Sequence, residues 1–156
     1  MSKESEAGFV VISLSESKLG NIFMANQRAC TLFRYAKKDI LNLRVNAIMP
    51  TVFADIHDQI LTDFLKKKRK KYNTDQRLLF GKDGNGFIFP LMLQLQRASF
   101  SANDEFIFIA SVAPAKLKSA PNYCIVDQEG AITDFTSTFR AIFYEKSKKD
   151  TKKNIQ

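Results

Sequence analysis

The stretch that decides the fold is "GNIFMANQRACTLFRYAKKDILNLRVNAIMP", residues 20–50. Its first six residues, 20–25, form an apolar run opened by a glycine, which predicts a β-strand. Asn26 follows at the position of an N-cap, directly before a short amphipathic helix. The residues of this helix that are expected to face inward are Ala29, Leu32 and Phe33. The remainder is too short and mixed for a long helix, so we predict one or two helical turns that end before Pro50.

Strands are predicted on both sides of this stretch. "FVVISL" (9–14) is apolar and β-branched, and the separator "SESKLG" joins it to the strand at 20–25 as a hairpin. Three later segments have strand character, at 74–80, 87–96 and 105–113. The turn signals "GKDGNG" (81–86) and "SANDE" (101–105) separate them. Pro90 cannot donate to a strand ladder, so it marks an irregular or edge position.

Residues 53–65 predict the longest helix of the chain. At about 100° per residue, its apolar residues fall in one arc and most of its polar residues in the opposite arc. The apolar arc holds Phe53, Ile56, Ile60, Leu61 and Phe64, and the opposite arc holds Asp55, Asp58, Gln59, Thr62 and Asp63. His57, the only histidine of the chain, lies inside the apolar arc. We therefore expect His57 to point into the interior of the domain.

The order of these elements predicts the fold class. Two strands are followed by short helices, one longer helix and three strands, which is typical of an antiparallel sheet with helices packed on one face. We therefore predict an α+β fold. The 156 residues allow one domain, or one domain plus a fragment. With 45% hydrophobic residues and 14 Phe, the chain can build a core.

The net charge of +8 is unevenly distributed along the chain. The basic residues 66–71 contribute six positive charges, and the tail 145–156 carries five Lys against two acids. The rest of the chain is close to neutral, whereas a nucleic-acid-binding face would have basic residues spread across it. We therefore interpret 66–71 as a solvated helix end and loop, and nucleic acid is not an expected partner.

Targeting signals and catalytic motifs are not found in the sequence. No apolar run approaches the roughly 20 residues that span a bilayer, so we expect membrane association only through other parts of a larger protein. Cys30 and Cys124 show no paired spacing, which favours a reducing compartment, and we expect the cytoplasm. With one histidine and no Gly-x-Ser-x-Gly motif, a catalytic triad is not expected, and we predict that the protein is not an enzyme.

The end of the chain repeats the pattern of its beginning. "GAITDFTSTFRAIF" (130–143) matches residues 20–33 at a constant offset of 110 residues. The identical positions are Gly20 and Gly130, Ile22 and Ile132, and Phe33 and Phe143. We therefore predict one domain over residues 7–115. Residues 116–156 would be a linker and the start of a second copy, cut off by the end of the chain, with a Lys-rich tail.

The stretch 20–50, together with "FGKDGNGFIFPLMLQLQ" and "FIFIASV", resembles the PAS sensor-domain family, and the resemblance covers residues 9–113. Its most specific positions are Gly20-x-Ile22, Asn26, Ala29, Phe33-x-Tyr35, Asp39-Ile40-Leu41, Met49-Pro50 and Asp83-Gly84. The resemblance implies a five-stranded antiparallel sheet in the order 2-1-5-4-3, with short helices on one face that enclose a small cavity. It also implies a non-catalytic sensory or protein-interaction module of a larger signalling or structural protein.

The chain also resembles the oxygen-sensing haem branch of this family. Six residues separate Met49-Pro50 from His57, and the resemblance makes His57 the axial ligand of haem iron. The cofactor-binding positions that it implies are His57, Arg77, Leu93, Leu95 and Ile60. Arg77 would hydrogen-bond bound oxygen. Asp63 departs from the pattern, because that branch has a basic residue there to help hold the haem propionates.

Three states of the cavity remain open: a core filled by side chains without a cofactor, a small apolar ligand, and haem b bound through His57. We expect the first, because several bulky residues can fill the space, namely Phe53, Phe64, Phe80, Phe87 and Phe89. Flavin is not expected, because the light-sensing branch has a cysteine after the Met-Pro region, whereas Cys30 lies on an earlier helix.

The resemblance further implies a protein partner or a homodimer that contacts the exposed sheet face. The candidate contact residues are Leu78, Phe80, Phe106 and Phe108. Two alternatives to a sensory or interaction module stay open, a haem-based gas sensor and a purely structural repeat in a large assembly.

Overall fold

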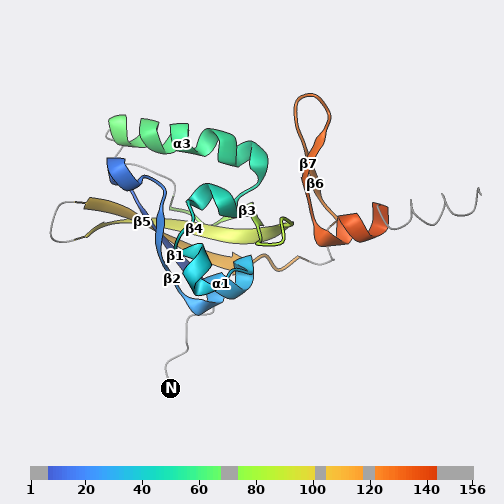
Figure 1. Ribbon diagram of the computed structural model, residues 1–156, viewed down its shortest axis with the longest axis horizontal. Coiled ribbons are helices and arrows are strands. Elements are labelled where there is room, and N and C mark those ends of the chain that lie inside the picture. The colour runs from blue at the N-terminus through green and yellow to red at the C-terminus, as the bar shows by residue number, and fades with distance from the viewer. Residues whose placement is uncertain (1–6, 68–73, 101–104, 118–121, 144–156) are drawn as a thin grey trace, which may run out of the picture.

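The computed structural model describes residues 7–67, 74–100, 105–117 and 122–143. Its main feature is a five-stranded antiparallel sheet with the strand order β2-β1-β5-β4-β3 (Figure 1). The strands are β1 (Gly8–Ser13), β2 (Ile22–Ala25), β3 (Arg77–Lys82), β4 (Ile88–Phe100) and β5 (Glu105–Pro114). The predicted α+β class and the strand order 2-1-5-4-3 are therefore confirmed.

Four helical segments between β2 and β3 pack on one face of this sheet. They are α1 (Gln27–Phe33), α2 (Lys37–Ile40), the 3₁₀ turn η2 (Val45–Ile48) and α3 (Thr51–Lys66), and another 3₁₀ turn, η1 (Glu16–Lys18), joins β1 to β2. Each of the four contributes a buried side chain to one core, namely Phe33, Ile40, Ile48 and Leu61. The sheet contributes to the same core with Val10, Ile12, Leu91, Phe108 and Val112.

Asn26 caps α1, as predicted. Its Oδ1 accepts hydrogen bonds from the backbone N–H of Ala29 (3.0 Å) and from that of Phe9 on β1 (2.9 Å). One side chain therefore satisfies a free donor of the first helical turn and also ties the helix to the sheet. The helix ends after Phe33 at Arg34, which adopts the left-handed conformation with φ 55°.

Asp83 builds the turn between β3 and β4. Its Oδ1 accepts hydrogen bonds from the backbone N–H of Asn85 (2.9 Å) and Phe87 (3.0 Å), and its carboxylate pairs with Arg34 (3.3 Å) at the end of α1. A Cβ on Gly84 would lie 2.7 Å from the carbonyl oxygen of Arg34, so the close approach of the turn to α1 requires glycine. The predicted hairpin turn is therefore confirmed.

Pro90 lies at an irregular position, as predicted. It pairs with Phe80 of β3, but the ladder between β4 and β5 begins one residue later, with Leu91 opposite Pro114. The missing N–H of the proline therefore interrupts no hydrogen bond of the β4–β5 ladder.

α3 forms as predicted, but only part of its predicted apolar arc faces the sheet. Only Leu61 is buried. Three residues that were predicted to face inward are instead exposed, namely Phe53 (51%), Ile56 (52%) and Ile60 (53%). Asp58, predicted to face solvent, is half-buried and forms a 2.8 Å ion pair with Arg44, directly before η2. The prediction of this face is therefore wrong for Phe53 and Ile56, because the predicted arc is wider than the face that α3 turns toward the sheet, whereas Leu61 and Phe64 do pack in the core.

Two residues predicted on the exposed sheet face lie on the opposite side. Phe108 is buried in the core that the helices cover, so its prediction as a contact residue is wrong. Phe106 stands two residues earlier on β5 and therefore shares that face, where its ring centre lies 3.8 Å from Cζ of Arg97. Leu78 is exposed by 54%, whereas the ring of Phe80 packs on another aromatic ring.

Residues 122–143 form a second, smaller unit. β6 (Cys124–Val126) and β7 (Ile132–Phe135) pair as an antiparallel hairpin, and residues 137–143 are helical. Thr136 stands before this helix, and its Oγ1 accepts hydrogen bonds from the backbone N–H of Phe139 and of Tyr123, both at 3.2 Å. The donors are placed much as they are around Asn26: one is the third residue of the helix, and the other lies at the beginning of the first strand (Phe9) or directly before it (Tyr123). The local hydrogen bonds of the first unit thus recur in the second.

Some predictions fall outside the described residues. Within the basic run 66–71, Lys66 is the last residue of α3 and Lys67 pairs with Asp63 over 3.9 Å. The rest of that run, the turn at 101–104 and the tail from residue 144 are not described. In the described ranges, no helix has both the length and the apolar character needed to cross a membrane.

Candidate functional site

A cavity of about 450 Å³ lies between the sheet and the segments α3 and η2. Its volume falls within the roughly 300–1,000 Å³ that is typical of ligand pockets. The helices and their flanks contribute Phe33, Val45, Ile48, Met49, His57, Ile60, Leu61 and Phe64, and the strands contribute Val10, Ile12, Arg77, Leu79, Phe80, Gly81, Leu91, Leu93, Leu95, Phe108, Ala110 and Val112. The lining is therefore almost entirely apolar, with one histidine and one arginine in it.

The predicted filling of this space by aromatic side chains is wrong. Of the five phenylalanines that were expected to fill the core, only Phe64 and Phe80 line the cavity. Phe53 is exposed on α3, Phe87 packs against Phe135, and Phe89 packs behind Phe33 without lining the cavity itself. The space stays open because α3 approaches the sheet with one fully buried side chain, Leu61.

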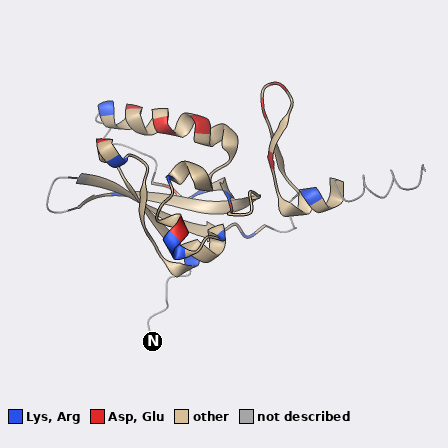
Figure 2. Cartoon of the chain, viewed as in Figure 1, with Lys and Arg blue, Asp and Glu red and all other residues tan. Residues whose placement is uncertain are grey.

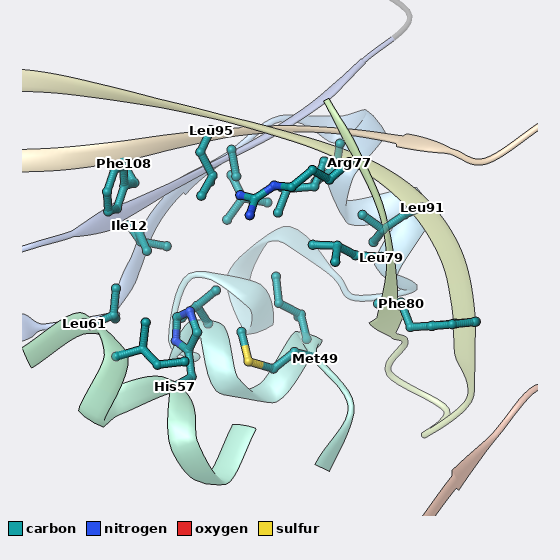
Figure 3. A pocket seen from close by; sticks show the side chains of 18 of the residues that line it. Ile12, Met49, His57, Leu61, Arg77, Leu79, Phe80, Leu91, Leu95 and Phe108 are labelled. Atoms are coloured by element: carbon teal, nitrogen blue, oxygen red, sulfur yellow. The ribbon is translucent and has the colours of Figure 1, made fainter. Parts of the chain in front are cut away.

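His57 forms part of the wall that α3 contributes (Figure 3). Its Nδ1 is buried and has no hydrogen-bond partner. Burial lowers the pKa of His57, the neighbouring Asp58 opposes this shift, and the charge of Arg44 adds to it, so the pKa lies below its usual value of 6.5. The imidazole at the cavity is therefore neutral at pH 7. The prediction that His57 points inward is confirmed.

Arg77 enters the cavity from β3, and its guanidinium lies across the space from His57 (Figure 3). Its Nε is buried and has no hydrogen-bond partner. The central strands carry few charged residues, while acidic positions follow one another along α3 (Figure 2). None of those acids is among the residues that line the cavity. Arg77 therefore brings a positive charge into an apolar space whose described lining offers no carboxylate.

The five predicted site residues surround this one cavity. Leu93 and Leu95 lie on its β4 wall, and Ile60 lies at its rim with 53% of its surface exposed. The η2 segment adds Val45, Ile48 and Met49, which the sequence analysis did not identify as site residues. The short helical turn before Pro50 was predicted, but its side-chain directions carry no periodic signal in so few residues.

The described lining of the cavity contains no nucleophile or carboxylate. Because it includes no Ser, Thr, Cys, Asp or Glu, His57 has no nucleophile to activate there. Across the described ranges, no group of three or more His, Cys, Asp and Glu side chains could hold a metal ion. What the arrangement can do is enclose an apolar molecule and present two nitrogen donors to it.

Haem fits this site incompletely. A neutral His57 on the cavity wall suits an axial ligand. However, a metal-bound histidine normally donates its other ring N–H to an orienting partner, whereas Nδ1 of His57 has none. Haem also carries two propionates, and Arg77 is the only cationic residue of the described lining. We therefore derive no chemistry through haem.

A buried carboxylate connects the smaller unit to two walls of the cavity. Asp134 on β7 is 2% exposed, and it accepts hydrogen bonds from the backbone N–H (2.9 Å) and Oγ1 (3.1 Å) of Thr51, the first residue of α3. It also pairs with Lys82 at the end of β3, with Nζ and Oδ1 2.8 Å apart. Burial acts to raise the pKa of Asp134, but the bonds from Lys82 and Thr51 outweigh it, and the pKa is lowered.

The comparisons with solved structures cover about 70% of the chain. No protein-family model matches the sequence, and no curated protein matches it either. The structure is similar to a PAS domain from Desulfitobacterium hafniense, with 14% identity, a TM-score of 0.54, and coverage of 70% of this chain and 93% of that one. It is similar to the PAS domain of an HTR-like protein from Haloarcula marismortui, with 17% identity, a TM-score of 0.52 and coverage of 71% and 83%.

A third similar structure is a PAS domain from a two-component sensor histidine kinase, with 14% identity, a TM-score of 0.51 and coverage of 70% of this chain and 86% of that one. At these identities the likeness concerns the fold. The sheet order β2-β1-β5-β4-β3, with its helices on one face, agrees with it. The unit that runs from β1 to β5 therefore has the PAS fold.

Proposed function

We propose that the PAS-fold unit is a non-catalytic sensory module that binds a small, largely apolar ligand in the cavity between α3 and the sheet. The observation that carries this proposal is the open cavity of about 450 Å³, lined by apolar side chains and two nitrogen donors without partners. Such convergence of a few polar groups in an apolar pocket is typical of ligand sites. The likeness to a PAS domain from a sensor histidine kinase supports a sensory role.

Asp134 supports a route by which occupancy would reach the rest of the chain. It binds the first residue of α3 and the last residue of β3, and these two elements carry His57 and Arg77. A ligand that changes the spacing between α3 and β3 would change the geometry around Asp134. Such a ligand shifts the equilibrium only by its difference in affinity for the two arrangements.

A cavity-filling substitution tests the proposal. We expect octanol, a neutral apolar probe, to shift the amide resonances of cavity-lining residues, and we expect Ala110→Leu to abolish the shifts by occupying the space. Ala113→Leu is the matched control, because Ala113 lies on the same strand, outside the cavity lining. Octanol that fails to bind, or that binds Ala110→Leu as well as the parent protein, would contradict ligand binding in this cavity and favour a purely structural repeat.

The proposal also includes a protein partner or a second copy on the sheet face that the helices leave open. Leu78 on β3 and Met24 on β2 support it, since each is exposed by 54%. We further propose a reducing, cytoplasmic location, in keeping with the free thiols of Cys30 and Cys124. The haem alternative predicts a Soret band that disappears in His57→Ala.

A further inference from the structure

We propose that the cavity is built for an amphiphilic monoanion, a molecule with a hydrocarbon body and one carboxylate, and that Arg77 and His57 bind the carboxylate. This inference rests on the proposed function and narrows it from an apolar ligand to a charged amphiphile.

The charge of Arg77 is the first argument. A guanidinium stays protonated at any physiological pH, and a buried charge is costly unless it is paired. The described lining of the cavity contains no acid, and the buried Nε of Arg77 has no hydrogen-bond partner. A ligand carboxylate would supply the missing counter-charge, and the planar guanidinium matches it with two parallel hydrogen bonds.

His57 is the second argument, because it limits where the carboxylate can lie. Its ring stands on the wall opposite Arg77, and its buried Nδ1 also lacks a partner (Figure 3). A neutral imidazole carries one N–H, on Nδ1 or Nε2, which can donate one hydrogen bond. A carboxylate between the two side chains would therefore receive donors from both walls, whereas a metal cation or an ammonium group would be repelled by Arg77.

The remaining lining defines the body of the ligand. Leu91, Leu93 and Leu95 of β4 stand on one face of their strand, and Phe108, Ala110 and Val112 of β5 continue it. This wall offers no hydrogen-bonding side chain. With one arginine in the described lining, a second carboxylate on the ligand would be buried without a counter-ion. A monoanion with a hydrocarbon chain suits both the apolar wall and the single arginine. A dicarboxylate would exceed the one positive charge, and a sugar would bury hydroxyl groups against the apolar wall without hydrogen bonds.

The test compares octanoate with octanol, which share a hydrocarbon chain and differ in charge. Both are titrated into the 156-residue chain and into Arg77→Gln, with affinity measured by calorimetry and the site located by amide shifts. A hydrogen bond to a charged group contributes enough for octanoate to bind about tenfold to a hundredfold more tightly than octanol. We expect Arg77→Gln to remove this preference, with a much smaller effect on octanol affinity than on octanoate affinity.

Arg97→Gln is the matched control, and Arg77→Lys is the second variant. Arg97 also has a half-buried guanidinium and lies on the same face of β4 as the leucines, but beyond the cavity, where it stacks on Phe106. We expect its loss to leave the preference intact. Arg77→Lys keeps the charge, so it should retain part of the preference if Arg77→Gln fails to fold.

Three outcomes would overturn the inference. Equal affinities for octanoate and octanol would remove the anion site and leave the apolar cavity as proposed. An octanoate preference that survives in Arg77→Gln would place the carboxylate elsewhere. If neither probe binds to the folded protein, the inference and the proposed function both fail.

Discussion

The segments 8–33 and 123–143 share their local structure and differ in their burial. Both run through strand, turn, strand and helix, and in both the residue before the helix accepts one hydrogen bond from the helix and one from a residue at, or directly before, the start of the first strand. Gly20 and Gly130 adopt nearly the same positive φ, 78° and 85°. All these contacts join residues that are close in sequence, so similar local sequences are sufficient to produce them twice.

Burial separates the two segments. Phe33 is 2% exposed and its counterpart Phe143 is 57% exposed, while Ile22 and Ile132 are 1% and 46% exposed. The first segment is covered by strands and helices far from it in sequence, and among the described residues nothing comparable covers the second. Local hydrogen bonds are therefore sufficient for the arrangement of strand, turn, strand and helix. Burying this arrangement in a core requires strands that are distant in the sequence. We propose that 123–143 is the opening of a second unit of the same type.

The largest expected difference in stability comes from the corresponding phenylalanines of the two segments, Phe33 and Phe143. Phe33→Ala should lower the free energy of unfolding by about 3–5 kcal/mol, because it opens a void in a packed core. Phe143→Ala should change it by no more than about 0.5 kcal/mol, as is usual for surface positions. Urea denaturation of both variants measures the difference.

Similar losses in the two variants would break the comparison, because Phe143 would then be buried in solution. A dependence of the Phe143→Ala effect on protein concentration would show that a second copy of the chain covers it.

Asp134 provides the next largest effect, because it holds the exposed segment against α3 and β3 of the larger unit. Asp134→Asn keeps an acceptor for Thr51 but removes the charge that pairs with Lys82, and we expect a loss of about 1–3 kcal/mol in the docking of residues 123–136. Hydrogen exchange should show faster exchange of amides in β6 and β7, with β1, β4 and β5 unchanged. Glu129→Gln, in the exposed turn of the same hairpin, serves as the control. Unchanged protection in Asp134→Asn would mean that other contacts hold the segment.

The fold could be predicted from the sequence because its signals are local. Asn26 before an amphipathic run predicts the start of α1, and the Asp83-Gly84 turn predicts the β3–β4 hairpin, since both depend on residues within a few positions. Which part of the apolar arc of α3 faces the core could not be predicted, because it depends on contacts with residues far away in the sequence, such as Phe108 beside Phe64. Hydrophobic periodicity identifies a helix but ignores such contacts.

The candidate site was predictable only in part, for a related reason. The inward direction of His57 follows from its position in the helix. The open cavity does not, because an empty space depends on how closely α3 approaches the sheet, and the sum of side-chain volumes does not give that distance. The contact between Thr51 and Asp134 spans 83 residues of sequence and leaves no local signal.

The smallest expected effect is the dependence of stability on pH, in which His57 of the larger unit and Asp134 of the smaller unit contribute in different pH ranges. The folded-state pKa of His57 is lowered from 6.5, so the unfolded chain binds more protons when the pH falls below about 6.5. Stability should therefore decline as the pH falls from about 6.5 to the folded-state pKa of His57, and then stop declining from this cause. The pKa of Asp134 is lowered from 3.8, so its contribution is present above that pH and is lost only in more acidic solution.

His57→Gln should remove the decline below pH 6.5, and Asp134→Asn should leave it in place. Because His57 is the only histidine in the chain, no other side chain has its usual pKa in that range. Denaturant titrations across this range, with the single imidazole followed by NMR, measure both stability and protonation. A decline that persists in His57→Gln would mean that another group causes it, and an imidazole of His57 that titrates at its usual pKa of 6.5 would mean that it is not desolvated in solution. The cavity wall would then be open to water, and the larger unit would be less closed than its side-chain burial indicates.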